Sequence, residues 1–353
     1  MTGKRGLWLL PLALLAYLLF WPVPIEPVAW TPPPPLDYEA LAQRVLPMKP
    51  IERLAAGECH ACEDVAVDSA GRVYGADERG IIKRYDPAAG RTEDFAITGG
   101  RPLGLHFDAG GNLLVADAIE GLLSVSPDGR VRLLSTGTPE RRVFVADDLD
   151  IAPDGAVYFS DASRRFPLTQ YKLDLLEHRP NGSFWVYRPD EGRTELLLDS
   201  LHFANGVAVS AEGDFVLVNE TGAYRVLRYW LKGPQRGRAE VFLDRLPGFP
   251  DGISRGENGL FWLTLLSPRK PALDALMARP FLRKILARLP AFLQPAPEPW
   301  AYVLGVDASG RVRYLFQDPE GAYQQISSVQ QFGNKLYLGS LAEDAVGVFT
   351  LPE

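Results

Sequence analysis

One pattern is repeated six times along this chain: a run of alternating apolar residues, a tight turn rich in Asp, Asn and Gly, and a second apolar run. The copies begin at Glu63, Leu103, Asp147, Asn205, Asp251 and Ile326. Between the copies lie further pairs of short apolar runs joined by Gly-bearing turns, which would complete four strands in each repeat. Repeats of this kind are typical of the blades of a β-propeller. We therefore predict an all-β, six-bladed β-propeller over residues 48–353.

The spacing between successive turn glycines is longest after Gly155 and after Gly259, which indicates insertions. In the second of these, residues 267–299, apolar residues recur at helical spacing with Arg and Lys between them. We expect a helical insertion there, between blades 5 and 6, either as a lid over the channel or as a contact with an anionic membrane surface. The last blade lacks its outermost strand, and the segment beginning at Met48 is expected to supply it.

The N-terminus carries a separate apolar segment. Lys4 and Arg5 precede an uncharged stretch from Gly6 to Ile25, about the length that spans the hydrocarbon core of a membrane. We expect residues 1–26 to form a cytoplasmic stub and a transmembrane signal anchor, with a cleaved signal peptide as the alternative. Because positive charge stays on the cytoplasmic side, a single-pass membrane protein with a periplasmic, extracellular or luminal propeller is predicted. Residues 27–47 are Pro-rich and are expected to be a tether.

The cysteine content and the net charge limit the metal sites and the partners that are possible. Cys59 and Cys62 are the only cysteines, and the chain lacks the further ligands at motif spacing that a zinc site needs. Outside the cytoplasm we expect them to form a disulfide. The net charge is −7 and there is no basic stripe, so we expect no nucleic-acid partner.

Four of the six copies begin with an oxygen-bearing side chain, eight residues before the turn glycine: Glu63, Asp147, Asn205 and Asp251. Equivalent positions on the inner strands of a propeller converge on its channel, and three carboxylates brought together repel one another. Calcium accepts carboxylate and amide oxygens in loose geometry. The sequence therefore predicts that these four residues bind Ca²⁺, and the alternative is a channel lining that is polar for structural reasons only.

A calcium ion held in this way would polarise the carbonyl group of an ester or a lactone, with Asp251 or Glu63 as the general base. The chain has no Gly-x-Ser-x-Gly, His-Glu-x-x-His or phosphate-binding Gly motif. We expect a hydrolase of small-molecule esters or lactones. The alternative is a non-catalytic propeller that binds a partner and holds a structural ion.

Several motifs, in order along the chain, are familiar: CEDVAVD, RPLGLHFD, DDLDIAPDGAVYFSDAS, LPGFPDGIS and LYLGSL. From about Leu54 to Leu351 the chain resembles the strictosidine synthase-like family, most closely its adipocyte plasma membrane-associated protein branch, in a superfamily with the paraoxonases and gluconolactonases. The resemblance implies a membrane-bound propeller with arylesterase-like activity and calcium at the four positions above.

Two positions depart from the patterns of this superfamily. Ser327 stands where strictosidine synthase carries its catalytic Glu, so a condensing reaction of that type is the least expected function. Leu103 stands where the paraoxonases carry a His.

Overall fold

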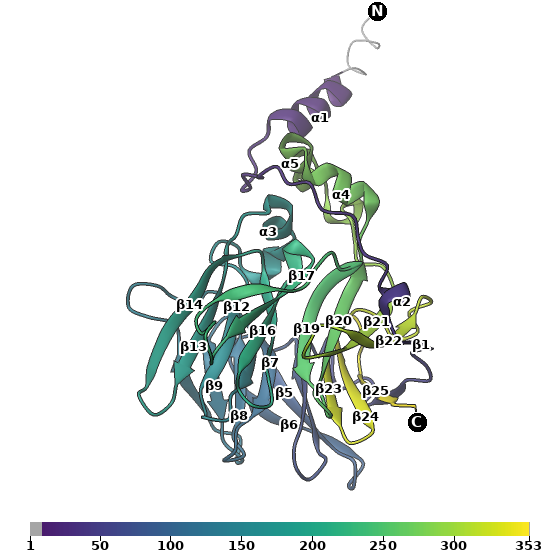
Figure 1. The fold of residues 1–353 in the computed structure, drawn as a ribbon. Coiled ribbons are helices and arrows are strands. Elements are labelled where there is room, and N and C mark those ends of the chain that lie inside the picture. Colours follow the sequence, from purple (N-terminus) through teal and green to yellow (C-terminus); the bar gives the residue numbers. More distant parts are fainter. Residues whose placement is uncertain (1–8, 353) are drawn as a thin grey trace, which may run out of the picture.

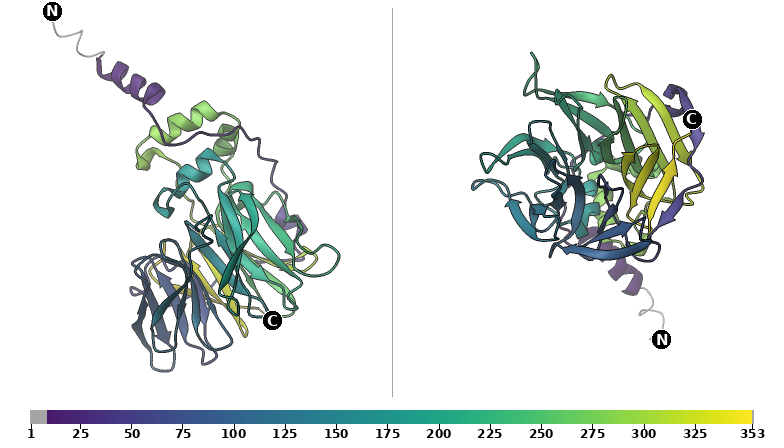
Figure 2. Two further views of the ribbon diagram at one scale, coloured as in Figure 1. Left: turned by 90° about the vertical axis from the view of Figure 1, so that its left-hand side faces the viewer. Right: turned by 90° about the horizontal axis from the view of Figure 1, so that it is seen from below.

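The computed structural model describes residues 9–352, and their strands form six sheets around a common axis, each built from antiparallel pairs apart from one parallel strand added to blade 5 (Figures 1 and 2). The first strand of each sheet packs against the first strand of the next and lies nearest the axis. The strands of blades 1 to 3 are β3 (Val65–Val67), β4 (Val73–Asp77), β5 (Ile81–Asp86) and β6 (Arg91–Ile97); β7 (Pro102–Phe107), β8 (Leu113–Asp117), β9 (Gly121–Val125) and β10 (Val131–Ser135); and β11 (Ala146–Ile151), β12 (Val157–Asp161), β13 (Gly182–Arg188) and β14 (Arg193–Leu201). Those of blades 4 to 6 are β15 (Ala204–Val209), β16 (Phe215–Glu220), β17 (Arg225–Trp230) and β18 (Ala239–Leu243); β19 (Gly248–Arg255), β20 (Leu260–Pro268), β21 (Ala301–Asp307) and β22 (Val312–Asp318); and β23 (Ile326–Phe332), β24 (Lys335–Ser340) and β25 (Val346–Thr350). The prediction of an all-β, six-bladed propeller is confirmed.

The N-terminal part of the chain closes the ring. Strand β2 (Glu52–Leu54) pairs antiparallel with β25 and completes the last blade, as predicted for the segment that begins at Met48. Strand β1 (Arg44–Pro47) adds in parallel to β22, so blade 5 has five strands. Both additions cover sheet edges that would otherwise expose unpaired backbone groups.

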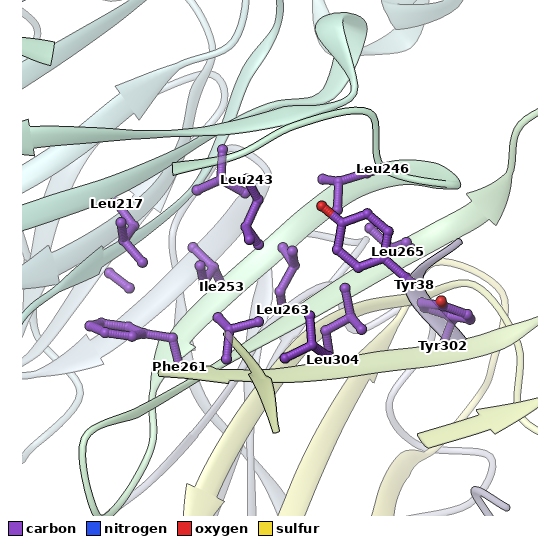
Figure 3. Close-up of a cluster of buried hydrophobic side chains, with 14 of the residues drawn as sticks. Tyr38, Leu217, Leu243, Leu246, Ile253, Phe261, Leu263, Leu265, Tyr302 and Leu304 are labelled. Atoms are coloured by element: carbon purple, nitrogen blue, oxygen red, sulfur yellow. The ribbon is translucent and has the colours of Figure 1, made fainter. Parts of the chain in front are cut away.

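Apolar side chains between adjacent blades form the core. Figure 3 shows the contact between blades 4 and 5, where Leu217 and Leu243 meet Ile253 and Leu263. Alternation along each strand sends every second side chain into such a contact, which is why the repeated pattern encodes the ring. Tyr38, from the short helix α2 (Tyr38–Leu41), packs into the same cluster.

Helices gather over one face of the disc (Figure 1). Helix α3 (Tyr171–Glu177) lies between β12 and β13, and helices α4 (Pro271–Met277) and α5 (Pro280–Arg288) lie between β20 and β21. The position predicted for the helical insertion, between blades 5 and 6, is wrong, because β20 and β21 pair with each other inside blade 5. Pro280 begins α5 after a break at Arg279, so the apolar periodicity belongs to two short helices.

The predicted transmembrane anchor is contradicted. Helix α1 comprises Leu9–Phe20, which is 12 residues. At 1.5 Å per residue it is about 18 Å long, against a hydrocarbon core of about 30 Å. None of the helices within residues 9–352 has the length and apolar character to cross a membrane, so the single-pass localisation is wrong. Lys4 and Arg5 lie outside the described residues.

The Pro-rich segment 27–47, predicted as a tether, runs along the helices and blade 5. The backbone N–H of Trp30 donates to the carbonyl of Met277 at 3.0 Å, and that of Leu36 donates to the carbonyl of Arg245 at 2.9 Å. The indole ring of Trp30 stacks on His178 with ring centroids 4.0 Å apart. The segment therefore joins the two helical insertions on the same face as α1.

Candidate functional site

Irregularities in the inner strands place the predicted site residues. The pairing register shifts between Ala146 and Leu149 in β11, between Ala204 and Val207 in β15, and between Pro250 and Ile253 in β19. The residues inside these three shifts include Asp147, Asn205 and Asp251. A bulge redirects the side chain of the extra residue, which explains why polar groups leave the regular alternation at this point.

The residue that follows each of these site residues contacts the inner strand of the neighbouring blade. A Cβ atom on Gly206 would lie 2.4 Å from the carbonyl oxygen of Asp251, so only glycine allows this approach. In blades 1 and 3 the equivalent residues are Asp64 and Asp148, whose carboxylates accept hydrogen bonds of 2.7 Å from backbone N–H groups of the next inner strand. Inner strands are thereby held together at the height of the site.

Glu63, Asp147, Asn205 and Asp251 all line one cavity of about 970 Å³. Apolar side chains from α3 and α4, including Leu175, Leu273 and Met277, line the same cavity. The structure therefore brings together the four residues that the repeat offset selected, beneath the helical insertions. Asp147 and Asp251 have exposed fractions of only 3% and 4%.

Burial dominates the electrostatics of these carboxyl groups. It raises the pKa of Glu63 to about 7, opposed by the charge of Arg101 and assisted by that of Asp64. Burial, followed by the negative charges of Glu63 and Asp251, raises the pKa of Asp147 well above its usual value. Asp251 is shifted in the same direction by burial and by Glu63. Negative charges brought together in this way repel one another, and a cation between them would relieve that repulsion.

Few protein groups neutralise this cluster. The side-chain amide of Asn205 donates to one carboxylate oxygen of Asp251, and the other oxygen, Oδ2, is buried with no partner among the described residues. A guanidinium nitrogen of Arg101 lies 3.5 Å from Glu63 Oε2. Within residues 9–352 we find no hydrogen bond or ion pair to the side chain of Asp147.

The chemistry of these groups suits a hard cation, because carboxylate and amide oxygens are the ligands that calcium takes and one carboxylate oxygen is buried without a partner. Across the described residues, however, no three His, Cys, Asp or Glu side chains are already placed to hold a metal ion. Binding would therefore require these side chains to move closer together.

Two residues that contact the candidate site were not among those selected from the sequence. Arg101 lines the cavity and pairs with Glu63. Asn219, on β16, is fully buried and its amide donates to the backbone carbonyl of Asp251. Arg101 begins the RPLGLHFD motif, two residues before Leu103. Asn219 lies on the second strand of its repeat, whereas the offset that selected the four residues concerns only the first strands.

The two copies of the repeat that begin with an apolar residue place no oxygen-bearing side chain at this first position. Leu103 and Ile326 are buried, and the neighbouring Ser327 donates a hydrogen bond of 2.6 Å to the backbone carbonyl of Glu63.

Cys59 and Cys62 form the expected disulfide.

Known proteins match this chain over most of its length, and two family models match parts of it. The family model for strictosidine synthase matches residues 147–234, and the model for the N-terminal part of strictosidine synthase-like proteins matches residues 48–85. Strictosidine synthase-like protein 6 of Arabidopsis thaliana is 35% identical, over 82% of this chain and 79% of its own. The bovine adipocyte plasma membrane-associated protein is 32% identical, over 94% and 85%. The chain belongs to the strictosidine synthase-like family.

Solved structures with the same fold include a gluconolactonase from Xanthomonas campestris, with a TM-score of 0.63, 17% identity and coverage of 94% of this chain and 98% of that one. A calcium-binding protein, regucalcin, from Agrobacterium tumefaciens has a TM-score of 0.62 at 16% identity, with coverage of 87% and 95%. At these identities the likeness concerns the propeller fold alone.

Proposed function

We propose that this member of the strictosidine synthase-like family is a calcium-dependent hydrolase of small-molecule esters or lactones, with Glu63, Asp147, Asn205 and Asp251 as the calcium ligands. The observation that carries the proposal is the convergence of three carboxylates and one amide in a cavity whose other walls are largely apolar; among the described residues, one arginine, Arg101, forms an ion pair with any of these carboxylates. The lactonase and calcium-binding names of the structural neighbours support it.

Calcium bound by these ligands would polarise the carbonyl group of the substrate. Glu63 or Asp251 would accept a proton from water as the water oxygen attacks the carbonyl carbon. The bond from carbonyl carbon to ester oxygen then breaks, and the departing oxygen takes a proton. The hydrogen bond from Asn205 orients the Asp251 carboxylate.

The test combines chelation with one ligand substitution. The purified protein, stripped with EGTA, is assayed with phenyl acetate and with a panel of lactones before and after calcium is restored. We expect activity only with calcium, and we expect Asp251→Asn to weaken calcium binding measured by titration calorimetry. Asp128→Asn is the matched control, since Asp128 lies on an exposed turn paired with Arg130.

Two outcomes would contradict the proposal. Turnover that survives complete removal of calcium refutes calcium dependence. Calcium binding without turnover on any ester or lactone supports instead a propeller that binds a partner and holds a structural ion.

A further inference from the structure

The loop that leads into Glu63 is closed by the Cys59–Cys62 disulfide. Both cysteines are buried, and their sulfur atoms pack over Gly75 on β4, where a Cβ atom would lie 2.5 Å from the sulfur of Cys59. Between them, Ala61 has a φ of 42°, in the left-handed region that a non-glycine residue adopts only when its surroundings hold it there. The Ala61 carbonyl thus belongs to the loop that the disulfide closes.

That carbonyl is one of three that hold Arg101. Nη2 of Arg101 donates to the carbonyl of Ala61 at 3.1 Å, and Nη1 donates to the carbonyls of Ala76 and Pro102 at 3.1 and 3.3 Å. Nη2 also lies 3.5 Å from Glu63 Oε2. The guanidinium group is thus held between the disulfide loop, β4 and the start of β7, and it faces Glu63.

The same loop is tied to blade 6. The N–H of Ala61 donates to the carbonyl of Glu343 at 2.9 Å, and the N–H of Ser340 donates to the carbonyl of Cys62 at 2.8 Å. Among the described residues, Arg101 is the one cationic side chain that forms an ion pair with any of the four proposed ligands. The position of Glu63 therefore depends on a contact that the disulfide loop supports from outside the cavity.

We propose that Arg101 is a positioning residue for Glu63, and that the Cys59–Cys62 disulfide acts on the site by holding the Ala61 carbonyl that orients Arg101. This inference rests on the proposed function, because Glu63 is taken as a calcium ligand. It assigns a role in the site to Arg101, Cys59 and Cys62, none of which is a proposed calcium ligand.

Arg101→Lys separates positioning from charge, because lysine keeps the positive charge and cannot reach three carbonyls with the planar fork of arginine. If Arg101 acted only through its charge, the variant would bind calcium like the wild type, and Arg101→Met would bind it more tightly. If Arg101 positions Glu63, both variants bind calcium more weakly. Losing a residue that orients a metal ligand typically costs about 10- to 100-fold in affinity.

The experiment measures calcium affinity by titration calorimetry for the wild type, Arg101→Lys, Arg101→Met, Cys59→Ala/Cys62→Ala, and the variant that combines Arg101→Lys with the cysteine changes. We expect a 10- to 100-fold loss for Arg101→Lys, a smaller loss without the disulfide, and little additional loss in the combined variant, because both changes act through one contact. Arg228→Lys is the matched control: Arg228 also donates to a backbone carbonyl, that of Ala308, on the outer strands. Thermal unfolding shows whether each variant is folded. If the cysteine variant does not fold, mildly reduced wild-type protein takes its place.

The outcomes are distinct. Wild-type affinity in Arg101→Lys refutes the positioning role and leaves the proposed function intact. Fully additive losses refute the link through the disulfide. Absence of calcium binding by the wild type refutes both the proposed function and this inference.

Discussion

Removing calcium should make the stability of this protein depend on pH in a direction set by Glu63. Its pKa is raised from 4.5 to about 7 in the folded state, so the folded protein holds this proton more tightly than the unfolded chain. The resulting stabilisation is complete below pH 4.5 and is lost as the pH rises through about 7. Asp147 and Asp251 have raised pKa values too, and their contributions have the same sign.

The magnitude follows from the size of this change. Each pH unit between the two pKa values corresponds to 1.36 kcal/mol, so Glu63 accounts for about 3 kcal/mol between acidic and neutral solution. If calcium binds the folded protein as proposed, it would oppose the loss: at about 100 times its Kd it would restore about 2.7 kcal/mol. Metal-free protein is therefore expected to be less stable at pH 8 than at pH 5, with calcium closing a part of the gap about as large as the Glu63 contribution.

Denaturant unfolding in EGTA at a series of pH values, with and without calcium, measures both effects. Glu63→Gln cannot ionise and should lose about 3 kcal/mol of the pH dependence, whereas Glu120→Gln, at an exposed position, should behave like the wild type. A Glu63→Gln variant whose stability changes with pH as steeply as that of the wild type would refute the reasoning about this carboxyl group.

Two further changes test the architecture. Arg283 is fully buried and donates to backbone carbonyls of α3 and of the N-terminal segment, so Arg283→Met should cost about 2–4 kcal/mol of unfolding free energy and speed limited proteolysis within residues 21–37. The neighbouring Lys284→Met is the control, and equal cleavage rates in the two variants would contradict the role of Arg283. In Gly252→Ala, the new Cβ would lie 2.3 Å from the carbonyl oxygen of Ser327 and force blades 5 and 6 apart, at a cost of about 1–3 kcal/mol by thermal unfolding. Gly110→Ala meets only flexible side chains at 3.3 Å or more, and a similar loss in that variant would show that the contact between blades is not responsible.

The blades could be predicted because their signals are local. Alternation of apolar residues and the position of a turn glycine depend on neighbours in the chain, and six copies made the ring evident. The blade to which an insertion belongs cannot be predicted from neighbouring residues. Helices α4 and α5 separate β20 from β21 in the chain, and the pairing of these strands, for example of Leu263 with Leu304, shows that both lie in blade 5.

The error at the N-terminus has a similar origin. The uncharged run from Gly6 to Ile25 has enough residues to span a membrane as a helix. The described helix, however, ends at Phe20, before Pro22. The carbonyls of Leu18 and Trp21 accept hydrogen bonds from Arg288 of α5, a residue more than two hundred positions away. Composition alone gave no sign of that contact.

By itself, the sequence determined the propeller and the choice of four oxygen-bearing residues, because equal offsets from equivalent turns place side chains at one height around an axis. Only the tertiary structure decided how those residues are surrounded. The bulges that redirect Asp147, Asn205 and Asp251 arise from strand pairing inside blades 3, 4 and 5. The approach of Arg101 to Glu63 is a contact between blades 1 and 2, and the cavity beneath the helices is lined by residues from several blades. Burial and charge at a site are properties of everything packed around it, and residues distant in the chain contribute most of that surrounding.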